Sequence, residues 1–343
     1  MPKITVLVAV YNAERFLPQC LDSLLAQTLA DIQIICVDDA SDDHSLQVLN
    51  QYAVRDLRVE VIKLEQNGGQ AHARNVGLQQ AKGDIVCMVD ADDWLAPDAL
   101  EQLYKAFDDQ TDSVLFTLVK VYEDGRQEAY PSPSTLHPSP FSGEEAFRMS
   151  LTWQIHGLYG IRAEIHRRHP YDETCRSYSD DNTTRIHYLC SRRVGFCVGV
   201  YYYRQHGDSV THQVSVRRFD YLRANESMRW QMLDLKIDRR WLDEYENHRW
   251  LNLVDVYMFY FVHGRELSEA ERRYGLEELH RVWATVDRRA LNKKTTAKFG
   301  YRPCRSWLMF RIQEWLYFTL RGFLGKTIRP AVVSVSPCGG ENY

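Results

Sequence analysis

The sequence predicts an open α/β fold, with a mostly parallel sheet flanked by helices, followed by a helical C-terminal region. Three observations support this prediction. Short apolar runs alternate with segments of helical periodicity through the first hundred residues. Carboxylates directly follow two of the apolar runs, as expected where parallel strands end at one ligand-binding edge. Beyond about residue 215, helical spacing with interspersed charges takes over.

The first hundred residues define four expected strands with helices between them. Residues 4–10, Ile-Thr-Val-Leu-Val-Ala-Val, predict a parallel strand that is buried on both faces. Further strands are expected at 33–37, 59–64 and 85–89, and helices at 15–27, 41–52 and 70–81. The helix at 41–52 would place Asp42 and Asp43 in its positive first turn. The alternation fades after about residue 112, with later strands expected at 114–122 and 194–203.

The composition excludes several classes of protein. The chain has 343 residues, of which 45% are hydrophobic and 26% charged, which is typical of a soluble globular protein. No apolar run approaches the ~18 residues of a spanning helix, so an integral membrane protein is not expected. The N-terminus lacks the features of a signal peptide, so we expect a cytosolic protein. The eight cysteines form no C-x-x-C pair and are expected to be reduced thiols.

Two carboxylates, Asp90 and Asp92, stand one residue apart at the end of the fourth expected strand. Side chains at positions i and i+2 share one face of a strand, so both carboxylates could reach one ligand. Mg²⁺ and Mn²⁺ prefer oxygen ligands, and Mg²⁺ commonly takes one or two protein carboxylates together with phosphates and water. A solvated turn in which Asp93 caps the next helix is the alternative interpretation.

Six short motifs share the first hundred residues with this acidic pair. They are Val6-Leu7-Val8-Ala9-Val10-Tyr11-Asn12, Val37-Asp38-Asp39-Ala40-Ser41-Asp42, Asn67-Gly68-Gly69, Ala73-Arg74-Asn75-Val76-Gly77, Ala81-Lys82-Gly83-Asp84 and Asp90-Ala91-Asp92-Asp93. In this order, they make residues 3–100 resemble family 2 glycosyltransferases of the A-type fold. One departure is Ala9, where the family commonly has proline; Tyr11 and Asn12 remain, so we expect little consequence.

The resemblance implies a binding site for a nucleoside-diphosphate sugar. Asp39 would hydrogen-bond the base, and Tyr11 and the backbone near Ala9 would line its pocket. Asn12 and Ser41, in the same two motifs, are also predicted to contact the donor. Arg74 is similar to an arginine near the donor diphosphate, where a guanidinium suits phosphate oxygens. A surface arginine on a helix is the alternative for Arg74.

The resemblance also implies a divalent cation, Mn²⁺ or Mg²⁺, as cofactor. Asp92 would hold it with Asp90, which would also contact the donor sugar or ribose. The cation would act as a Lewis acid on the departing diphosphate. Arg204, in a segment that resembles the family's Tyr-Arg…Ser-x-Thr pattern, would be a second phosphate contact. His206 could be a third metal ligand or a solvated loop histidine.

An inverting transferase needs a general base that takes the proton from the acceptor hydroxyl. In the family this carboxylate usually lies in an acidic doublet beyond the D-x-D motif, and Asp180-Asp181 occupies that place here. We predict Asp181 as the base and Asp180 as its neighbour. The reverse assignment stays open, and so does the alternative that both acids cap a helix at 182–190.

The charge of the chain is unevenly distributed. Residues 288–330 hold eleven lysines and arginines and one acid, Glu314, although the whole chain carries a net charge of −4. Such a basic segment points to nucleic acid or an anionic membrane surface as partner. No nucleic-acid recognition motif accompanies it, so nucleic-acid binding is not predicted.

Residues 305–324 have the pattern of an amphipathic helix. An apolar arc contains Leu308, Met309, Ile312, Trp315, Leu316, Leu320 and Phe323, and Arg311, Glu314 and Arg321 lie opposite. An apolar face with cationic surroundings predicts a helix that lies in a membrane interface. A helix that packs on the catalytic domain, or that pairs in a homodimer, is the alternative.

The sequence therefore predicts two domains and an enzyme. Residues 1–215 would form a catalytic domain, with a donor and metal half at 1–110 and an acceptor half at 111–215. Residues 216–343 would form a helical region with the basic amphipathic segment at about 290–330. The expected activity is inverting, metal-dependent transfer from a nucleoside-diphosphate sugar, with UDP favoured, to a hydroxyl of a glycan acceptor.

The predicted setting is the synthesis of surface polysaccharide, lipopolysaccharide or capsule, in the cytoplasm at the inner face of the cytoplasmic membrane. A lipid-linked acceptor would suit that location. One alternative is a glycosyltransferase that acts on polyprenyl phosphate. Another is a non-catalytic nucleotide-binding scaffold of the same fold.

Overall fold

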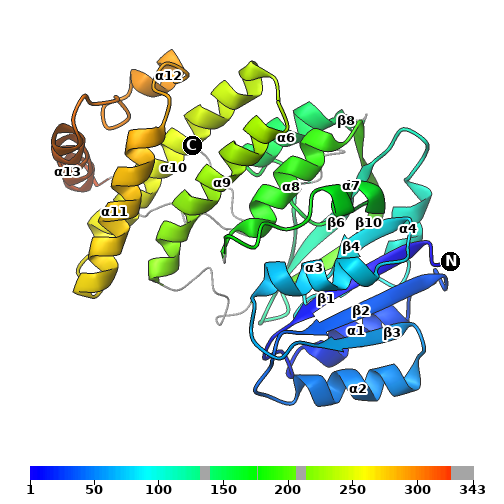
Figure 1. The fold of residues 1–343 in the computed structure, drawn as a ribbon. Coiled ribbons are helices and arrows are strands. Elements are labelled where there is room, and N and C mark those ends of the chain that lie inside the picture. Colours follow the sequence, from blue (N-terminus) through cyan, green and yellow to red (C-terminus); the bar gives the residue numbers. More distant parts are fainter. Residues whose placement is uncertain (132–139, 176, 206–213, 326–343) are drawn as a thin grey trace. The chain divides into compact units, whose positions relative to one another are not determined.

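The computed structural model describes residues 1–131, 140–175, 177–205 and 214–325 (Figure 1). The contacts within the chain divide it into two compact units, which meet in sequence at residues 209 and 210. The boundary predicted from the sequence was at 215. Each unit is described by itself below.

The first unit is built on one mixed sheet, and its parallel part comes from the first ninety residues. Strand β1 (Ile4–Val10) pairs in parallel with β2 (Ile32–Asp38) on one side and β4 (Ile85–Met88) on the other. Strand β3 (Val59–Lys63) pairs in parallel with β2. The carboxyl ends of these four strands therefore meet at one edge, and the four predicted strands are confirmed.

The remainder of the sheet mixes strand directions. Beyond β4 lie β9 (Tyr159–Arg162), β6 (Ser113–Tyr122), β10 (Arg193–Gln205) and β5 (Trp94–Leu95), in the order β4-β9-β6-β10-β5. Strand β9 is antiparallel to both of its neighbours, whereas β10 and β6 are parallel. Short strands β7 (Gln127–Ala129) and β8 (Phe141–Ser142) pair with β6 and β10. This antiparallel insertion explains why the regular alternation fades after residue 112.

Helices cover both faces of the sheet. Side chains of β1 alternate: Val6 and Val8 pack in one apolar core, with residues of α1 (Leu17–Leu25), α2 (Ser45–Arg55) and α4 (Ala99–Lys105). Leu7 points into a second core with α3 (Gln70–Gln80). The unit also contains α6 (Gly143–Leu151), α7 (Ala163–Arg168) and α8 (Ser179–Cys190). Burial on both faces explains the uninterrupted apolar run of β1.

The start of α2 differs from the prediction. The helix begins at Ser45, so Asp42 and Asp43 lie in the preceding loop and not in a first turn. Their backbone and side chains bond to the loop after β1: the Asp42 N–H donates to Asn12 Oδ1 at 2.8 Å, and the Glu14 N–H donates to Asp43 Oδ2 at 3.0 Å. These contacts join the loops at the ends of β1 and β2.

The second unit is helical in its described part, as predicted. It contains a short 3₁₀ turn at Val216–Phe219 and helices α9 (Asp220–Asp234), α10 (Arg239–His263), α11 (Glu269–Thr285), α12 (Lys293–Thr296) and α13 (Trp307–Phe323). Phe219 and Trp250 are fully buried in its core. A buried ion pair joins Arg249 to Glu246 on α10 at 2.8 Å. None of the described helices combines the length and apolarity that crossing a membrane requires.

Candidate functional site

Asp39 organises the carboxyl edge of the sheet at the end of β2. Its carboxylate is buried and accepts hydrogen bonds from the backbone N–H groups of Gly68 at 2.7 Å and Gly69 at 2.8 Å. Gly69 has φ of 87°, a conformation that glycine adopts without strain. The Asn-Gly-Gly motif is thus explained by the loop after β3 folding onto Asp39.

Four of the predicted donor residues meet at this edge. Tyr11 follows β1 and is 50% exposed. The next residue, Asn12, has φ of 49° and donates its backbone N–H to Ser41 Oγ at 3.1 Å. Ala9 is part of β1 and pairs in register with Val37, two residues before Asp39. The structure brings Ala9, Tyr11, Asn12 and Ser41 together around the end of β1.

Arg74 on α3 reaches the acidic motif after β4. Its Nη2 donates to Asp90 Oδ1 at 2.6 Å, and its guanidinium lies 5.1 Å from the ring centre of Tyr171. Burial disfavours the charged guanidinium, but the nearby Tyr171, Asp90 and Asp180 outweigh it and raise the pKa of Arg74. The alternative of a surface arginine is wrong, because Arg74 is buried.

Asp90 is held in place from two sides. Besides Arg74, Gln70 Nε2 donates to Asp90 Oδ1 at 3.2 Å. Burial raises the pKa of Asp90, the Arg74 charge opposes this, and Asp92 and Asp180 raise the pKa further. Asp90, Asp92 and Asp180 are therefore close enough to interact electrostatically, and Arg74 is the cation among them.

Asp93 anchors the acidic loop to β10. Its buried carboxylate accepts hydrogen bonds from the Tyr201 hydroxyl and from the Arg204 backbone N–H, both at 2.8 Å. The Tyr201 hydroxyl also accepts the backbone N–H of Asp90 at 3.1 Å. Helix α4 begins after Asp98, so the alternative in which Asp93 caps that helix is wrong.

Arg204 contacts the same loop with its side chain. Its Nε donates to the backbone oxygen of Asp92 at 2.7 Å and its Nη2 donates to Gln19 Oε1 at 2.5 Å. The guanidinium lies within 5 Å of the ring centres of Phe16 and Trp94. Arg204 thus supports the backbone of the D-x-D motif, and its predicted phosphate contact stays a prediction. His206 lies outside the described residues.

The donor set of this site suits a hard divalent cation that also binds phosphate. In the described part of the chain, no group of three or more His, Cys, Asp or Glu side chains is placed to hold a metal ion. A cation at this edge would therefore have two protein carboxylates at most, and other ligands would have to complete its shell. The acidic loop supplies two carboxylates, Asp90 and Asp92, which matches the small protein share of a Mg²⁺ site completed by phosphates and water. The residues present therefore fit the predicted cation.

The acidic doublet lies in the first turn of α8, which begins at Ser179 rather than at the expected residue 182. Asp181 is 2% exposed, and burial raises its pKa, with Asp180 adding to the rise and Arg185 opposing it. Asp180 is half-buried, and its charge acts on Arg74 and Asp90. Of the two carboxylates, Asp180 is the one that the structure brings to the D-x-D motif.

Two supporting residues were not predicted. Tyr201 joins Asp90 to Asp93, as described above. Asn75 Nδ2 donates to the Tyr171 backbone oxygen at 2.8 Å and to Glu173 Oε1 at 2.7 Å, and Asn75 Oδ1 accepts the Tyr171 N–H at 2.9 Å. Asn75 therefore holds the segment that carries Tyr171 beside Arg74. Its place in the Ala-Arg-Asn-Val-Gly motif was the available signal.

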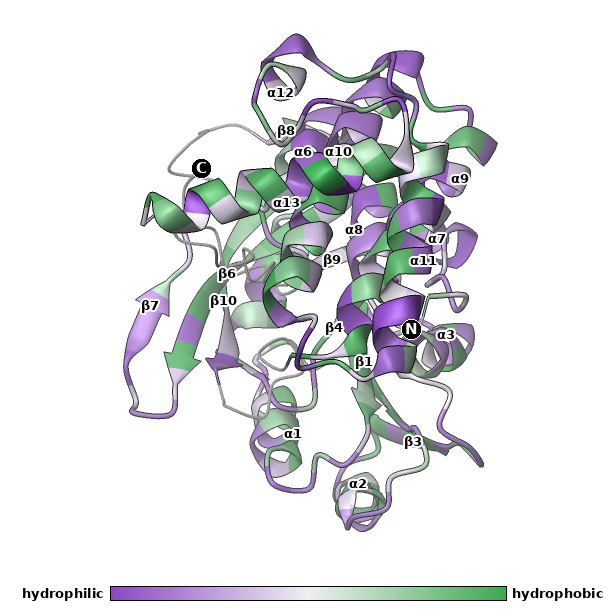
Figure 2. Cartoon of the chain, turned by 90° about the vertical axis from the view of Figure 1, so that its left-hand side faces the viewer, coloured by the Kyte–Doolittle hydropathy of each residue, from purple (hydrophilic) through white to green (hydrophobic). Residues whose placement is uncertain are grey.

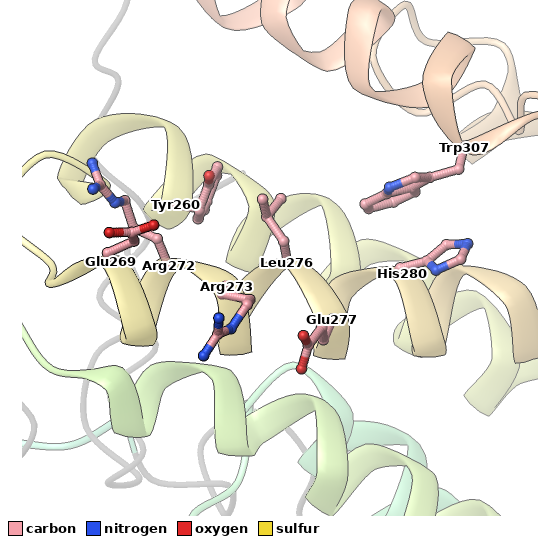
Figure 3. Close-up of a pocket in the computed structure, with 8 residues that line it drawn as sticks. All are labelled: Tyr260, Glu269, Arg272, Arg273, Leu276, Glu277, His280 and Trp307. Atoms are coloured by element: carbon pink, nitrogen blue, oxygen red, sulfur yellow. The ribbon is translucent and has the colours of Figure 1, made fainter.

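A separate hollow of about 520 Å³ lies in the second unit (Figure 3). It contains none of the predicted site residues. Its lining combines aromatic side chains with charges of both signs and consists of Tyr260, Glu269, Arg272, Arg273, Leu276, Glu277, His280 and Trp307. It has no share in the cluster at the sheet edge.

The chain is similar in sequence and in fold to known proteins. Residues 5–169 match the model of glycosyl transferase family 2. Two proteins of Bacillus subtilis (strain 168) are similar: the "putative glycosyltransferase EpsH" is 31% identical over 64% of this chain, and the "uncharacterized glycosyltransferase EpsJ" is 32% identical over 62%. These matches cover 65% and 63% of the relatives, so the chain spans less than two thirds of their length.

A solved structure resembles nearly the whole chain. The crystal structure of S. aureus TarS 1–349 in complex with UDP-GlcNAc superposes with a TM-score of 0.71, over 95% of this chain and 93% of that one. The two sequences are 20% identical, so the likeness concerns the fold.

Proposed function

We propose that the protein is a family 2 glycosyltransferase of the A-type fold, because residues 5–169 match the model of that family and the fold resembles that of TarS. It would move a sugar from a nucleoside-diphosphate donor to a hydroxyl of a glycan acceptor. The observation that carries the proposal is the cluster at the carboxyl edge, where Arg74 stands among the carboxylates Asp90, Asp92 and Asp180. A buried guanidinium beside three carboxylates suits a ligand that contains phosphate groups and binds together with a metal ion.

The donor would lie along the carboxyl ends of β1, β2 and β4. Tyr11 and the buried Asp39 would contact the base, with Asn12 and Ser41 shaping the same loop pair. Arg74 would face the diphosphate, because a guanidinium matches phosphate oxygens. UDP is the favoured nucleotide, and the fold likeness to TarS, which was solved with UDP-GlcNAc, supports this choice.

Asp92 and Asp90 would hold Mn²⁺ or Mg²⁺. When bound, such a cation neutralises charge on the diphosphate leaving group. The hydrogen bonds of Tyr201 and Arg204 to the loop keep the two carboxylates presented at the edge. A preorganised loop matters because a site that must rearrange before it binds its ligand loses affinity.

Asp180 is our choice for the general base, ahead of Asp181. The base must reach an acceptor hydroxyl, and Asp181 is almost completely buried whereas Asp180 is half-buried beside Arg74 and Asp90. Asp180 would take the proton from the hydroxyl as its oxygen attacks the anomeric carbon on the face opposite the diphosphate. Attack from that face inverts the anomeric configuration.

A nucleotide-binding experiment tests the proposed site. The melting temperature of the full chain would be measured with UDP, GDP, dTDP and CDP, each with and without Mn²⁺. We expect UDP to raise it mainly in the presence of Mn²⁺. Asp92→Asn should remove that gain, and the matched control Asp84→Asn, an exposed carboxylate outside the cluster, should retain it. No shift with any nucleotide would contradict the transferase.

Product analysis tests the reaction. NMR of the product gives the anomeric configuration of the transferred sugar. Transfer to a glycan acceptor with inversion of that configuration supports the proposal. Retention of the configuration would contradict the assigned base. Transfer to polyprenyl phosphate alone would identify the alternative enzyme. A role in surface polysaccharide, lipopolysaccharide or capsule synthesis, and a lipid-linked acceptor, are parts of the same proposal.

A further inference from the structure

Helix α13 turns its most apolar face to the solvent. The side chains of this face are between 41% and 85% exposed and are Leu308, Met309, Ile312, Trp315, Leu316, Leu320, Phe323 and the adjoining Leu324. Figure 2 shows the long hydrophobic stretches along α13. We call these eight residues the apolar arc; all but Leu324 belong to the arc predicted from the sequence. Exposed apolar patches of this extent mark interaction sites.

The other side of α13 is packed into the second unit. Phe310 and Phe318 are buried, and the Phe310 ring centre lies 5.6 Å from those of Trp250 and Tyr257 on α10. The Phe318 ring centre is 5.6 Å from that of Phe261, also on α10. The helix is therefore attached through one side, and the exposure of the apolar arc does not come from a detached helix.

Glu314 is on the packed side and is fully buried, which corrects the expectation that it lies on the polar solvent face. The carboxyl accepts a hydrogen bond from Gln313 Nε2 at 3.2 Å, and burial raises its pKa to about 8. Glu314 is the one acid in residues 288–325. Its burial leaves residues 288–325 with no acidic side chain at the surface.

The segment that leads into α13 exposes cations and no acid. These exposed residues are Lys293, Lys294, Lys298, Arg302 and Arg305. Phe299, in the same segment, is 52% exposed. The hollow in Figure 3 differs, because its lining includes Glu269 and Glu277 as well as arginines. The positive surface is therefore a property of residues 293–325 and not of the whole helical unit.

We propose that α13 binds the surface of an anionic phospholipid bilayer. The apolar arc would enter the boundary between headgroups and acyl chains, and the cations of residues 293–305 would contact lipid phosphates. A bilayer offers hydrocarbon and negative charge side by side, which is the complement of this surface. A second copy of the chain fits less well, because pairing through α13 would bring two cationic segments together. The proposal is independent of the sugar-transfer chemistry.

Vesicle sedimentation with the full chain tests it directly. We expect binding to vesicles of mixed phosphatidylcholine and phosphatidylglycerol, weak binding to phosphatidylcholine alone, and a loss of affinity as salt rises. Nucleotide and metal are absent from this assay, so its result does not depend on the proposed enzyme activity. Equal binding to neutral and anionic vesicles, or no binding to either, would overturn the proposal.

Two pairs of matched variants assign the binding to α13 and to the cationic segment that precedes it. Trp315→Ala should weaken vesicle binding by about tenfold, because one large apolar side chain no longer enters the bilayer. Trp230→Ala on α9 is its control, since Trp230 is 61% exposed and Trp315 is 55% exposed. Lys293→Gln with Lys294→Gln should weaken binding by up to about 25-fold, at a factor of about five for each charge. Arg272→Gln with Arg273→Gln is the control.

The stability of the variants, the binding of the two controls and the oligomeric state of the protein also test the proposal. Melting temperatures of the four variants should match the wild type, since these side chains are on the surface or at its margin. If both control variants weaken binding as much as the α13 variants, another surface binds the lipid and the proposal fails. If the protein dimerises without lipid and Trp315→Ala abolishes the dimer, the apolar arc is covered by a second copy and the proposal fails as well.

Discussion

The carboxyl edge of the sheet and helix α13 differ in how many hydrogen bonds and ion pairs their carboxyl groups form. At the edge, Asp90 is paired with Arg74, and both oxygens of Asp93 accept hydrogen bonds. On α13, Glu314 Oε1 accepts one bond from its neighbour, and Oε2 has no hydrogen-bond partner among the described residues. The acids at the edge are thus fixed by hydrogen bonds, whereas the acid of α13 is buried and the charged side chains exposed between residues 293 and 325 are cationic.

The largest effect should come from the acids at the edge. Asp180→Asn should lower kcat/KM for sugar transfer by about a thousandfold, because general-base catalysis contributes factors of this size. The thermal shift with UDP and Mn²⁺ should persist, since Asp180 is not assigned to the donor. Asp181→Asn should reduce turnover far less. A loss confined to Asp181→Asn would restore the assignment first made from the sequence.

The packing of α13 is tested by two apolar substitutions of similar chemistry on opposite sides of the helix. Phe318→Ala should lower the free energy of unfolding by about 3 kcal/mol, because Phe318 is 1% exposed and leaves a cavity. Leu320→Ala should change it by less than about 0.5 kcal/mol, because Leu320 is 52% exposed. Urea unfolding measures both. Equal effects would mean that α13 packs differently.

The buried acid of α13 predicts a pH dependence of stability. Burial raises the pKa of Glu314 from 4.5 to about 8, so the folded chain holds this proton more tightly than the unfolded chain. Its contribution to stability is therefore complete below about pH 4.5 and is lost as the pH rises toward 8. Glu314→Gln should be more stable than the wild type at pH 8 by about 4 kcal/mol, at about 1.4 kcal/mol for each pKa unit.

The same variant should be close to the wild type in stability at pH 5, where Glu314 is already neutral. Denaturant unfolding at both pH values isolates the effect of this one group, since all other titrating groups are common to the two proteins. A difference that does not depend on pH would contradict the buried, protonated carboxyl.

The smallest expected effect concerns the support of the acidic loop. Tyr201→Phe removes the hydroxyl that joins the Asp90 N–H to the Asp93 carboxylate, at a cost of about 1 kcal/mol in the free energy of unfolding. Donor affinity should fall modestly, because the loop that carries Asp92 is held less firmly. Tyr202→Phe, a half-buried neighbour, is the matched control. Unchanged nucleotide binding would show that Arg204 alone holds the loop.

The parallel half of the sheet was predictable because its signals are local. Apolar runs such as 4–10 and acids at strand ends need only neighbouring residues to be recognised. The four-residue β9 carries no comparable signal, and it runs antiparallel to both of its neighbours, β4 and β6. The candidate site was predicted from motifs, but the roles of Asn75 and Tyr201 depend on partners 96 and 111 residues away.

Glu314 was misplaced for a related reason. The helical periodicity places Glu314 opposite the apolar arc, and in an amphipathic helix the side opposite the apolar face commonly faces water. The structure packs that side against α10, with Phe310 and Phe318 around the acid. Helical periodicity therefore separates the apolar arc of α13 from the opposite side. It does not predict which of the two sides packs against the rest of the second unit.

The packed side and the exposed apolar side of α13 have a practical consequence for handling the protein. A helix whose exposed side is this apolar favours adsorption and precipitation during purification, and trimming it off would be the usual remedy. Removing residues 307–325 would also uncover Trp250 and Tyr257, which the Phe310 ring contacts. Replacing Leu308, Ile312 and Leu316 by glutamine should improve solubility while the packed side of the helix stays intact.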